Sequence, residues 1–400
     1  MFRIWHCLSD LGLSSTIAAC MIDISWLSFL QFDKSYDYDN FVLQDVYVLR
    51  VSVLLVVASS LLLSSSSLAL AEQAKQAAKP WSIHVLKPGG VAQSLAPKQI
   101  NLPDGVTGAE SLAFDRRGQG PYAGVSDGRV LKWDATAQHW TTFCYSANYK
   151  NTPMCTASTL RSDDAESVCG RPLGLQFHAR TGDLYIADSY LGLMKVGPGG
   201  GEATVLAAEA DDGVPFTFVN GVDVDQATGD VYFTDSSTTY TRAHNTEILL
   251  HRDSTGRLLR YDARSGKAIV LKSGLPYPNG VALSADRSYV VVAHTGPCQA
   301  FRYWLKGPKA GSYELFANLP GYADNVRRDT KGGYWFALNR ESIDATAPEH
   351  LVGVRVDGKG VGHEVVTAPE GVTLSDIAER DGNLWLGSVE LDYVGRVNYK

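Results

Sequence analysis

A short pattern that recurs six times constrains this chain more than any other feature of its sequence. Each copy has a first residue that is usually polar, a small or polar residue and then an apolar residue. The copies begin at Glu110, Leu173, Asn220, Asn279, Asp324 and Ser375, with starts 45 to 63 residues apart. A unit that repeats with such a period cannot cover its own apolar faces, so it must pack against its neighbours.

The rest of each copy predicts strands. A turn such as Thr228-Gly229-Asp230 leads to an apolar and aromatic segment such as residues 231–235. Two such segments joined by a turn of this composition are typical of a β-hairpin. We therefore predict an all-β fold, a six-bladed β-propeller in one domain. A sandwich or a doubly wound fold fits less well, because few segments show helical periodicity. Residues 72–100 are expected to supply a strand that closes the ring against the last blade.

The N-terminal part of the chain differs from the repeats. Arg50 precedes an apolar run over residues 51–63, and Ala69-Leu70-Ala71 supplies a small-x-small cleavage pattern. The run is shorter than the roughly 20 residues of a membrane span. We predict a signal peptide over residues 46–71, with a retained signal anchor as the alternative. Residues 1–45 form an extension expected to be unstructured, and residues 72–400 the propeller. The expected location is the secretory pathway, meaning the endoplasmic reticulum, the vacuole or the extracellular space.

Charge and cysteine content narrow the class of protein. The net charge is −7 and no stripe of Lys or Arg is present, which argues against nucleic acid as a partner and leaves a small molecule as the expected one. Three of the six cysteines, Cys144, Cys155 and Cys169, lie close together in sequence. One disulfide is expected within this segment in an oxidising compartment, but spacing alone does not define the pair.

The six starting residues predict a metal site. The first strand of each propeller blade lies beside the central axis, so these residues should occupy equivalent positions around the channel mouth. Carboxylate or carboxamide oxygens come from Glu110, Asn220, Asn279 and Asp324, and Asn325 is a further candidate ligand. Such oxygens suit a divalent cation, above all Ca²⁺, whereas zinc prefers Cys and His. The alternative is a wet channel in which polar residues bond only to water and backbone, with Asn-Gly as turn chemistry.

Several motifs resemble those of the plant strictosidine synthase-like family. They are Cys169-Gly170-Arg171-Pro172-Leu173-Gly174-Leu175, Ala187-Asp188-Ser189-Tyr190-Leu191-Gly192-Leu193, Phe233-Thr234-Asp235-Ser236-Ser237, Gly256-Arg257-Leu258-Leu259-Arg260-Tyr261-Asp262 and Tyr303-Trp304-Leu305-Lys306-Gly307-Pro308. The resemblance covers roughly residues 80–400. It implies a six-bladed propeller in the plant secretory pathway or vacuole. It also implies a disulfide between Cys144 and Cys169, which leaves Cys155 over.

The resemblance also bears on activity. True strictosidine synthase condenses tryptamine with secologanin and uses a glutamate as general acid–base. The matching position here is Ser375, and a serine cannot carry out that proton transfer at neutral pH. Asp376 is adjacent, but alternation along a strand is expected to turn it away from the channel. This departure counts against synthase activity.

The candidate ligands are also similar to the metal ligands of paraoxonase- and gluconolactonase-type propellers, which hydrolyse lactones and esters with a divalent cation. These ring residues are Glu110, Asn220, Asn279, Asp324 and Asn325. Leu173 stands where paraoxonase has a catalytic histidine, so Leu173 and Ser375 are expected only to line the channel. The expected function is therefore a calcium-dependent hydrolase of esters or lactones. An amine–aldehyde condensation and a non-catalytic binding propeller remain alternatives.

Two residues are candidates for the base that activates water. Asp324 would both bind the cation and accept the proton, and His294 is the other candidate because imidazole titrates near neutrality. The alternative for His294 is a hydrogen-bonded histidine in a blade. Asp188 and Asp235 end equivalent strand-like segments and are expected to stabilise turns. An insertion over residues 236–253 is expected to form either a short helix at 247–251 over one end of the channel or a surface loop.

Overall fold

The computed structural model describes residues 83–86, 93–157, 163–341, 349–369 and 371–399. The chain divides into two compact units, residues 1–79 and residues 80–400. The predicted extension, the signal segment, Cys7 and Cys20 lie outside the described residues. Within the described part of the second unit, no helix is long and apolar enough to span a bilayer.

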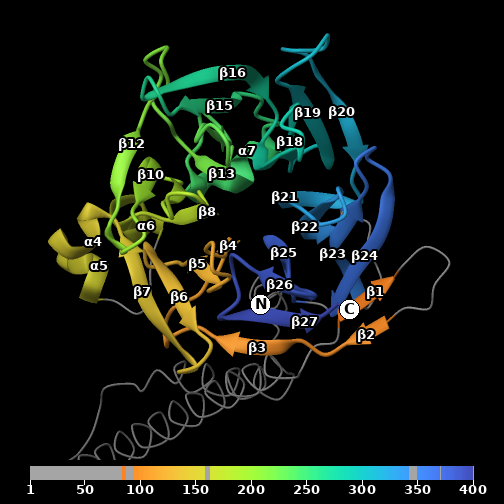
Figure 1. The fold of residues 1–400 in the computed structure, drawn as a ribbon. Coiled ribbons are helices and arrows are strands. Elements are labelled where there is room, and N and C mark those ends of the chain that lie inside the picture. The colour runs from red at the N-terminus through yellow and green to blue at the C-terminus, as the bar shows by residue number, and fades with distance from the viewer. Residues whose placement is uncertain (1–82, 87–92, 158–162, 342–348, 370, 400) are drawn as a thin grey trace, which may run out of the picture. The chain divides into compact units, whose positions relative to one another are not determined.

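Six mainly antiparallel sheets stand around a central axis, and each is one blade (Figure 1). The main strands of each blade follow one another outward from the axis in chain order, and edge strands from elsewhere in the chain extend three of the blades. Blade 1 contains β4 (Leu112–Ala113), β5 (Tyr122–Gly124), β6 (Arg129–Asp134) and β7 (His139–Tyr145); blade 2 contains β8 (Pro172–Phe177), β9 (Leu184–Asp188), β10 (Gly192–Val196) and β12 (Thr204–Ala207); blade 3 contains β13 (Val219–Val224), β14 (Val231–Asp235), β15 (Gly256–Asp262) and β16 (Lys267–Leu275). Blade 4 contains β17 (Pro278–Leu283), β18 (Tyr289–His294), β19 (Gln299–Trp304) and β20 (Tyr313–Asn318); blade 5 contains β21 (Gly321–Arg328), β22 (Tyr334–Glu341), β23 (Glu349–Val356) and β24 (Gly362–Pro369); blade 6 contains β25 (Asp376–Arg380), β26 (Asn383–Gly387) and β27 (Tyr393–Asn398). The predicted six-bladed propeller is confirmed.

The ring closes as the sequence predicts. Strand β3 (Lys98–Asn101) pairs antiparallel with β27 at the outer edge of blade 6, with Asn101 opposite Tyr393. Strands β1 (Ile83–Leu86) and β2 (Gln93–Leu95) extend blade 5 beyond β24, and β11 (Gly201–Glu202) pairs with β7. The last blade is thus completed by a strand from the start of the propeller, which joins the two ends of the ring.

Apolar side chains from neighbouring blades interdigitate and form the core. Val281 and Val290 of blade 4, for example, pack with Tyr232 and Leu258 of blade 3. Each such burial contributes roughly 1.5–3 kcal/mol. The inner strands come very close together, because a Cβ on Gly280 would lie 2.4 Å from the backbone nitrogen of Val326. The glycine of this Asn-Gly pair lies within a strand and permits close approach, rather than forming a turn.

Three short helices join blades 1 and 2, and a helical insertion lies within blade 3. The first group is α4 (Ala147–Asn151), α5 (Pro153–Ala157) and α6 (Asp163–Cys169), and the insertion is η1 (Arg242–His244) followed by α7 (Asn245–Leu250). Both groups contribute to the candidate site.

Candidate functional site at the channel mouth

A cavity of about 520 Å³ occupies one mouth of the channel. Its floor contains Glu110, Leu173, Asn220, Asn279 and Asp324, the starting residues of five successive repeats. The sequence repeat therefore predicted correctly that these residues, up to 214 positions apart, meet at one place.

Irregular backbone presents the ring residues to the cavity. The ladder between the two inner strands shifts register between Val219 and Val222 in blade 3, between Pro278 and Val281 in blade 4, and between Ala323 and Val326 in blade 5. Each shift contains a ring residue and its neighbour. Such bulges re-aim side chains. A similar shift between Pro172 and Gly174 contains Leu173 in blade 2, so the irregularity coincides with starting residues in four blades.

The two ring asparagines are oriented by equivalent hydroxyl groups. Nδ2 of Asn220 donates to Oγ of Ser236 over 3.1 Å, and Nδ2 of Asn279 donates to Oγ1 of Thr295 over 3.1 Å. Each hydroxyl in turn donates to a carbonyl of the next blade, Ser236 to Pro278 and Thr295 to Ala323, both over 2.7 Å. With the amide nitrogens engaged, the Oδ1 atoms of both asparagines are buried without a hydrogen-bond partner in the described part of the structure.

Glu110 is oriented in a similar way. Its Oε1 accepts a hydrogen bond from Nδ2 of Asn325 over 3.0 Å, whereas its buried Oε2 has no partner among the described residues. Asn325 is not among the residues that line the cavity. Its amide supports Glu110, which differs from the ligand position that we predicted for it.

Burial makes ionisation of the two ring carboxyls unfavourable. It raises the pKa of Asp324 to about 7, against the opposing effect of hydrogen bonds from Asn339 and Asn279. Burial also raises the pKa of Glu110 well above its usual range, and the nearby charges of Asp324 and Asp376 act in the same direction. Two buried carboxylates are costly unless a positive charge compensates them, and Oε2 of Glu110 also lacks a hydrogen-bond partner among the described residues.

The donor set fits a hard divalent cation. Within the described part of the chain, three buried acceptor oxygens of the cavity lack hydrogen-bond partners, on Glu110, Asn220 and Asn279, and Asp324 adds a second carboxylate. Carboxylate and amide oxygens are the ligands that Ca²⁺ prefers. The described residues contain no group of three or more His, Cys, Asp or Glu side chains that could hold a metal ion, so a site here depends on the asparagine oxygens as well as the two carboxylates.

Leu173 lines the cavity as expected, whereas Ser375, also expected to line the channel, is not among the residues that line the cavity. Leu173 packs with Phe218, Ile248 and Tyr277 in an apolar wall of the cavity. Oγ of Ser375 is fully buried and donates to the backbone carbonyl of Glu110 over 2.8 Å. This serine supports the backbone that carries a ring carboxylate.

Asp376 does not turn away from the channel, and that prediction is wrong. Its buried carboxylate forms an ion pair with Arg327 at 2.8 Å and accepts a hydrogen bond from the backbone N–H of Leu112. Arg327 also reaches Oγ of Ser111 and the carbonyl of Leu175, so it links blade 5 to blades 6, 1 and 2. The inner strands of all blades converge on the axis. A side chain that points from such a strand toward the neighbouring blade therefore still lies in the interior of the propeller.

His294 is not placed to act on a substrate, which corrects its candidacy as a base. It is fully buried and does not line the cavity. Nδ1 donates to the carbonyl of Pro276 over 2.7 Å, and Nε2 bonds to the hydroxyl of Tyr313. Burial lowers the pKa of His294 to about 4. Strand alternation explains the difference, since the next residue, Thr295, is the one that lines the cavity.

Asp188 and Asp235 stabilise local structure, as expected. Asp188 accepts hydrogen bonds from the backbone N–H groups of Tyr190 and Leu191 in the turn that follows β9. Asp235 accepts one from the N–H of Phe218 and pairs with Arg257 at 2.7 Å.

Of the two alternatives for the insertion, the structure has the short helix, α7, which begins two residues earlier and ends one residue earlier than the expected 247–251. Ile248 is buried against the apolar wall, and Leu249 and Leu250 line the cavity. Arg242 in η1 also lines the cavity, and its Nη1 pairs with Oε2 of Glu166 in α6 at 2.5 Å. Sequence reasoning did not identify Arg242, Glu166 or Tyr277, because no repeat position marks them.

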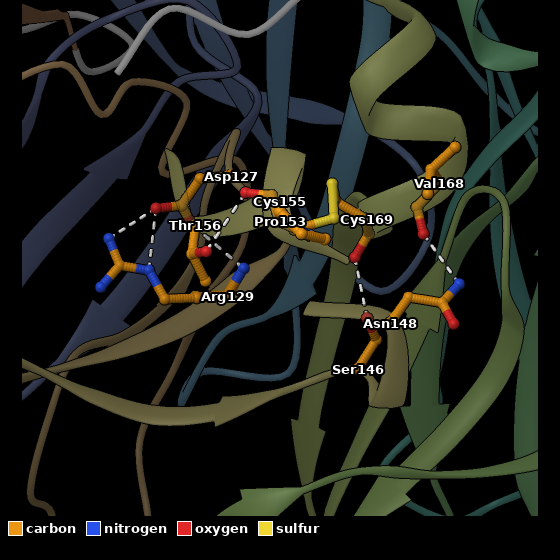
Figure 2. The surroundings of a disulfide bond; sticks show 9 residues. All are labelled: Asp127, Arg129, Ser146, Asn148, Pro153, Cys155, Thr156, Val168 and Cys169. Atoms are coloured by element: carbon orange, nitrogen blue, oxygen red, sulfur yellow. Dashed lines mark hydrogen bonds and ion pairs between the residues drawn. A yellow bond between two sulfur atoms is a disulfide. The ribbon is translucent and has the colours of Figure 1, made fainter. Parts of the chain in front are cut away.

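The disulfide differs from the one implied by the resemblance. Cys155 and Cys169 are bonded (Figure 2), whereas Cys144 is a free, buried thiol. Strand β7 directs Cys144 into the core between blades 1 and 2. Ser146 and Asn148 then connect this segment to α6 by donating to the carbonyls of Cys169 and Val168, over 2.9 and 2.8 Å.

Comparisons with solved structures agree with the propeller. A gluconolactonase from Xanthomonas campestris superposes with a TM-score of 0.56 at 16% identity, covering 80% of this chain and 95% of that one. The calcium-binding protein regucalcin from Agrobacterium tumefaciens gives a TM-score of 0.51 at 15% identity, covering 75% and 95%. At such identities the likeness concerns the fold.

Sequence relatives are much closer. A family model described as strictosidine synthase matches residues 220–308. Protein STRICTOSIDINE SYNTHASE-LIKE 10 of Arabidopsis thaliana is 42% identical over 330 residues, which cover 74% of this chain and 87% of that protein. Protein STRICTOSIDINE SYNTHASE-LIKE 13 of the same plant is 38% identical over 325 residues, covering 75% and 80%. The chain therefore belongs to the strictosidine synthase-like family.

Proposed function

We propose that this protein is a calcium-dependent hydrolase of esters or lactones. The observation that carries the proposal is a set of three buried oxygens that have no hydrogen-bond partner among the residues the structure describes, on residues that line one cavity: Glu110 Oε2, Asn220 Oδ1 and Asn279 Oδ1. Uncompensated buried acceptors are rare in folded proteins. A cation shared by these oxygens and Asp324 gives each of them a partner.

The chemistry divides between the cation and the protein. When bound, the cation supplies positive charge that polarises the substrate carbonyl and stabilises the developing oxyanion. Asp324 lines the cavity beside the other ring oxygens and accepts the proton of the attacking water. The water oxygen bonds to the carbonyl carbon, the bond from that carbon to the leaving oxygen breaks, and the proton passes from Asp324 to the leaving oxygen.

The cavity walls favour a substrate with an apolar part. Leu173, Phe218, Tyr277, Leu249 and Leu250 contribute apolar surface around the ring. Helix α7 covers part of this space and limits access of bulk water, which strengthens electrostatic interactions inside. A small organic ester or lactone fits a cavity of this size better than a peptide or a polymer.

Synthase-type condensation has less support. The position of the synthase's glutamate is Ser375, whose hydroxyl is engaged with the carbonyl of Glu110. The other nearby carboxylate, Asp376, is paired with Arg327. Neither group is available to transfer protons to an amine or an aldehyde in the cavity.

We also propose an oxidising compartment, namely the endoplasmic reticulum, the vacuole or the extracellular space. The Cys155–Cys169 disulfide supports it, because such bonds persist mainly in secretory proteins. The location of the protein fused to a fluorescent marker at its C-terminus tests this proposal.

The function is tested by metal analysis together with a substrate screen. Purified protein is expected to contain calcium after dialysis against metal-free buffer, and to hydrolyse members of a panel of aryl esters and lactones. A chelator should abolish the hydrolysis and added calcium should restore it. Absence of metal with no hydrolysis would indicate a non-catalytic binding propeller. Product formation from tryptamine and secologanin would instead indicate a synthase.

A further inference from the structure

We infer that Tyr277 is a catalytic residue that donates a hydrogen bond to the carbonyl oxygen of the substrate as negative charge develops there. The inference deepens the proposed hydrolase function and rests on it. Nothing in the sequence repeat marks this tyrosine, because it lies outside the six starting positions.

The first observation is the position of the Tyr277 side chain. It lines the cavity together with Asn279 and Asp324, and only 8% of the residue is exposed. Its ring packs against Phe218, with ring centroids 6.1 Å apart. Its hydroxyl has no hydrogen-bond partner among the described residues, although buried tyrosine hydroxyls usually have one. The hydroxyl is also not among the fully enclosed polar atoms, so a molecule in the cavity has access to it.

The second observation is the backbone of Tyr277. Its φ is 44°, in the left-handed region that residues other than Gly, Asn and Asp rarely adopt. Strain of this kind is concentrated at functional sites, where the surrounding structure imposes it. Here the conformation directs the bulky phenol side chain into the cavity, two residues before the candidate ligand Asn279.

The end of strand β18 maintains this conformation. His294 donates from Nδ1 to the carbonyl of Pro276, and the N–H of Thr295 donates to the carbonyl of Tyr277 over 3.1 Å. Thr295 also orients Asn279 through its hydroxyl. The segment His294-Thr295 therefore positions both Tyr277 and Asn279. The buried His294 is thus a positioning residue.

The third observation is the chemistry of the ring itself. Each ring asparagine directs an N–H group to a hydroxyl, Asn279 also donates to Asp324, and the Oδ1 atoms of both have no partner among the described residues. Besides the cation of the proposed function, a substrate carbonyl next to these acceptor oxygens therefore takes its protein hydrogen bond from a residue outside the ring. A phenol is protonated at neutral pH and donates one hydrogen bond. Arg242 is the charged donor on the cavity wall, but its Nη1 is engaged with Glu166.

The test is Tyr277→Phe, which removes only the hydroxyl. We expect kcat on the best ester or lactone to fall about 100-fold, as on loss of one oxyanion donor, while KM changes by less than about 3-fold. Calcium should still raise the melting temperature as in wild type, because the ring ligands are untouched. Tyr303→Phe, in the blade that follows Tyr277 and away from the cavity, is the matched control and should retain wild-type kcat.

A second readout does not depend on turnover. A phosphonate analogue of the best substrate mimics the tetrahedral oxyanion, and its affinity should fall at least about 10-fold in Tyr277→Phe. If the phenylalanine variant does not fold, Tyr277→Asn carries the test, because Asn tolerates a left-handed backbone. Wild-type kcat and phosphonate affinity in a folded variant would overturn the inference and leave the hydrolase proposal intact. A wild-type protein without hydrolysis or calcium binding would overturn the proposed function itself.

Discussion

The side-chain amide of Asn325 donates to Oε1 of Glu110 over 3.0 Å, so only Oε2 of that carboxylate is left without a partner. Ser236 and Thr295 act in the same way on Asn220 and Asn279. In each case a neighbouring group engages one polar atom of a ring residue, and the other polar atom is an unpaired oxygen. These supporting contacts, as much as the ring residues, define the site.

Removal of a supporting hydroxyl should weaken cation binding. In Thr295→Ala the amide of Asn279 loses its hydroxyl acceptor and keeps only the hydrogen bond to Asp324, so its orientation is less fixed and calcium affinity should fall about 10- to 100-fold, as for other supporting groups of metal sites. Thr295→Ser keeps the hydroxyl and should restore most of the affinity. Calorimetric titration of the two variants checks this. Equal affinities in Thr295→Ala and wild type would show that the hydroxyl does not orient Asn279.

Metal-free protein should lose stability as pH rises from about 4 to 7. The pKa of Asp324 is raised to about 7, whereas an unfolded aspartate titrates near 3.9. Between these values the folded state keeps a proton that the unfolded state has lost, so the free energy of unfolding falls by up to about 1.4 kcal/mol per pH unit. Glu110 acts in the same direction.

Denaturant unfolding at several pH values in the presence of a chelator measures this dependence. Asp324→Asn should flatten the slope, and excess calcium should reverse it, because the cation binds the ionised carboxylates. A slope that is identical in wild type and Asp324→Asn would contradict the assigned pKa shift.

Breaking the ion pair across the channel should destabilise the whole ring. Arg327 pairs with the fully buried Asp376 and bridges four blades. Arg327→Met leaves that carboxylate buried without its charge partner, at an expected cost of about 3–5 kcal/mol in the free energy of unfolding. Arg328→Met, at an exposed neighbouring position, is the control. A cost below about 1 kcal/mol for Arg327→Met would show that water or other groups compensate Asp376.

The disulfide should be detectable by peptide mapping. Digestion of the unreduced protein is expected to yield a peptide pair joined through Cys155 and Cys169, with Cys144 recovered as a free thiol. The bond closes a loop of 14 residues, so Cys155→Ser should lower the free energy of unfolding by about 3 kcal/mol. Recovery of a Cys144–Cys169 pair would contradict the structure.

The repeat made the fold and the ring predictable, because blades are equivalent and their first residues necessarily meet at the axis. Glu110, Leu173, Asn220, Asn279 and Asp324 line one cavity as that argument requires. The supporting residues Ser236 and Thr295 follow equivalent strand ends, so the same alignment contained a signal for them.

Other features depend on geometry that a repeat does not encode. His294 and Thr295 are adjacent, and only the direction of β18 decides that Thr295 reaches the cavity. The position of Asp376 was not predicted, because the inner strands converge on the axis and a side chain that points toward the neighbouring blade stays in the interior of the propeller. The disulfide pair depends on how α5 and α6 pack, and Tyr277 depends on one left-handed residue between two blades.

Calcium titration of chelator-treated wild type and Asn279→Ala tests the central claim most directly. Asn318→Ala, an exposed amide on the outer strand of the same blade, is the control. Wild type and Asn318→Ala should bind about one calcium ion per chain. They should gain about 2.7 kcal/mol of stability at 100-fold excess over Kd. Asn279→Ala should lose that binding and that gain. A wild-type protein that takes up no calcium and shows no thermal shift, or an Asn279→Ala variant that binds as wild type does, would contradict the account.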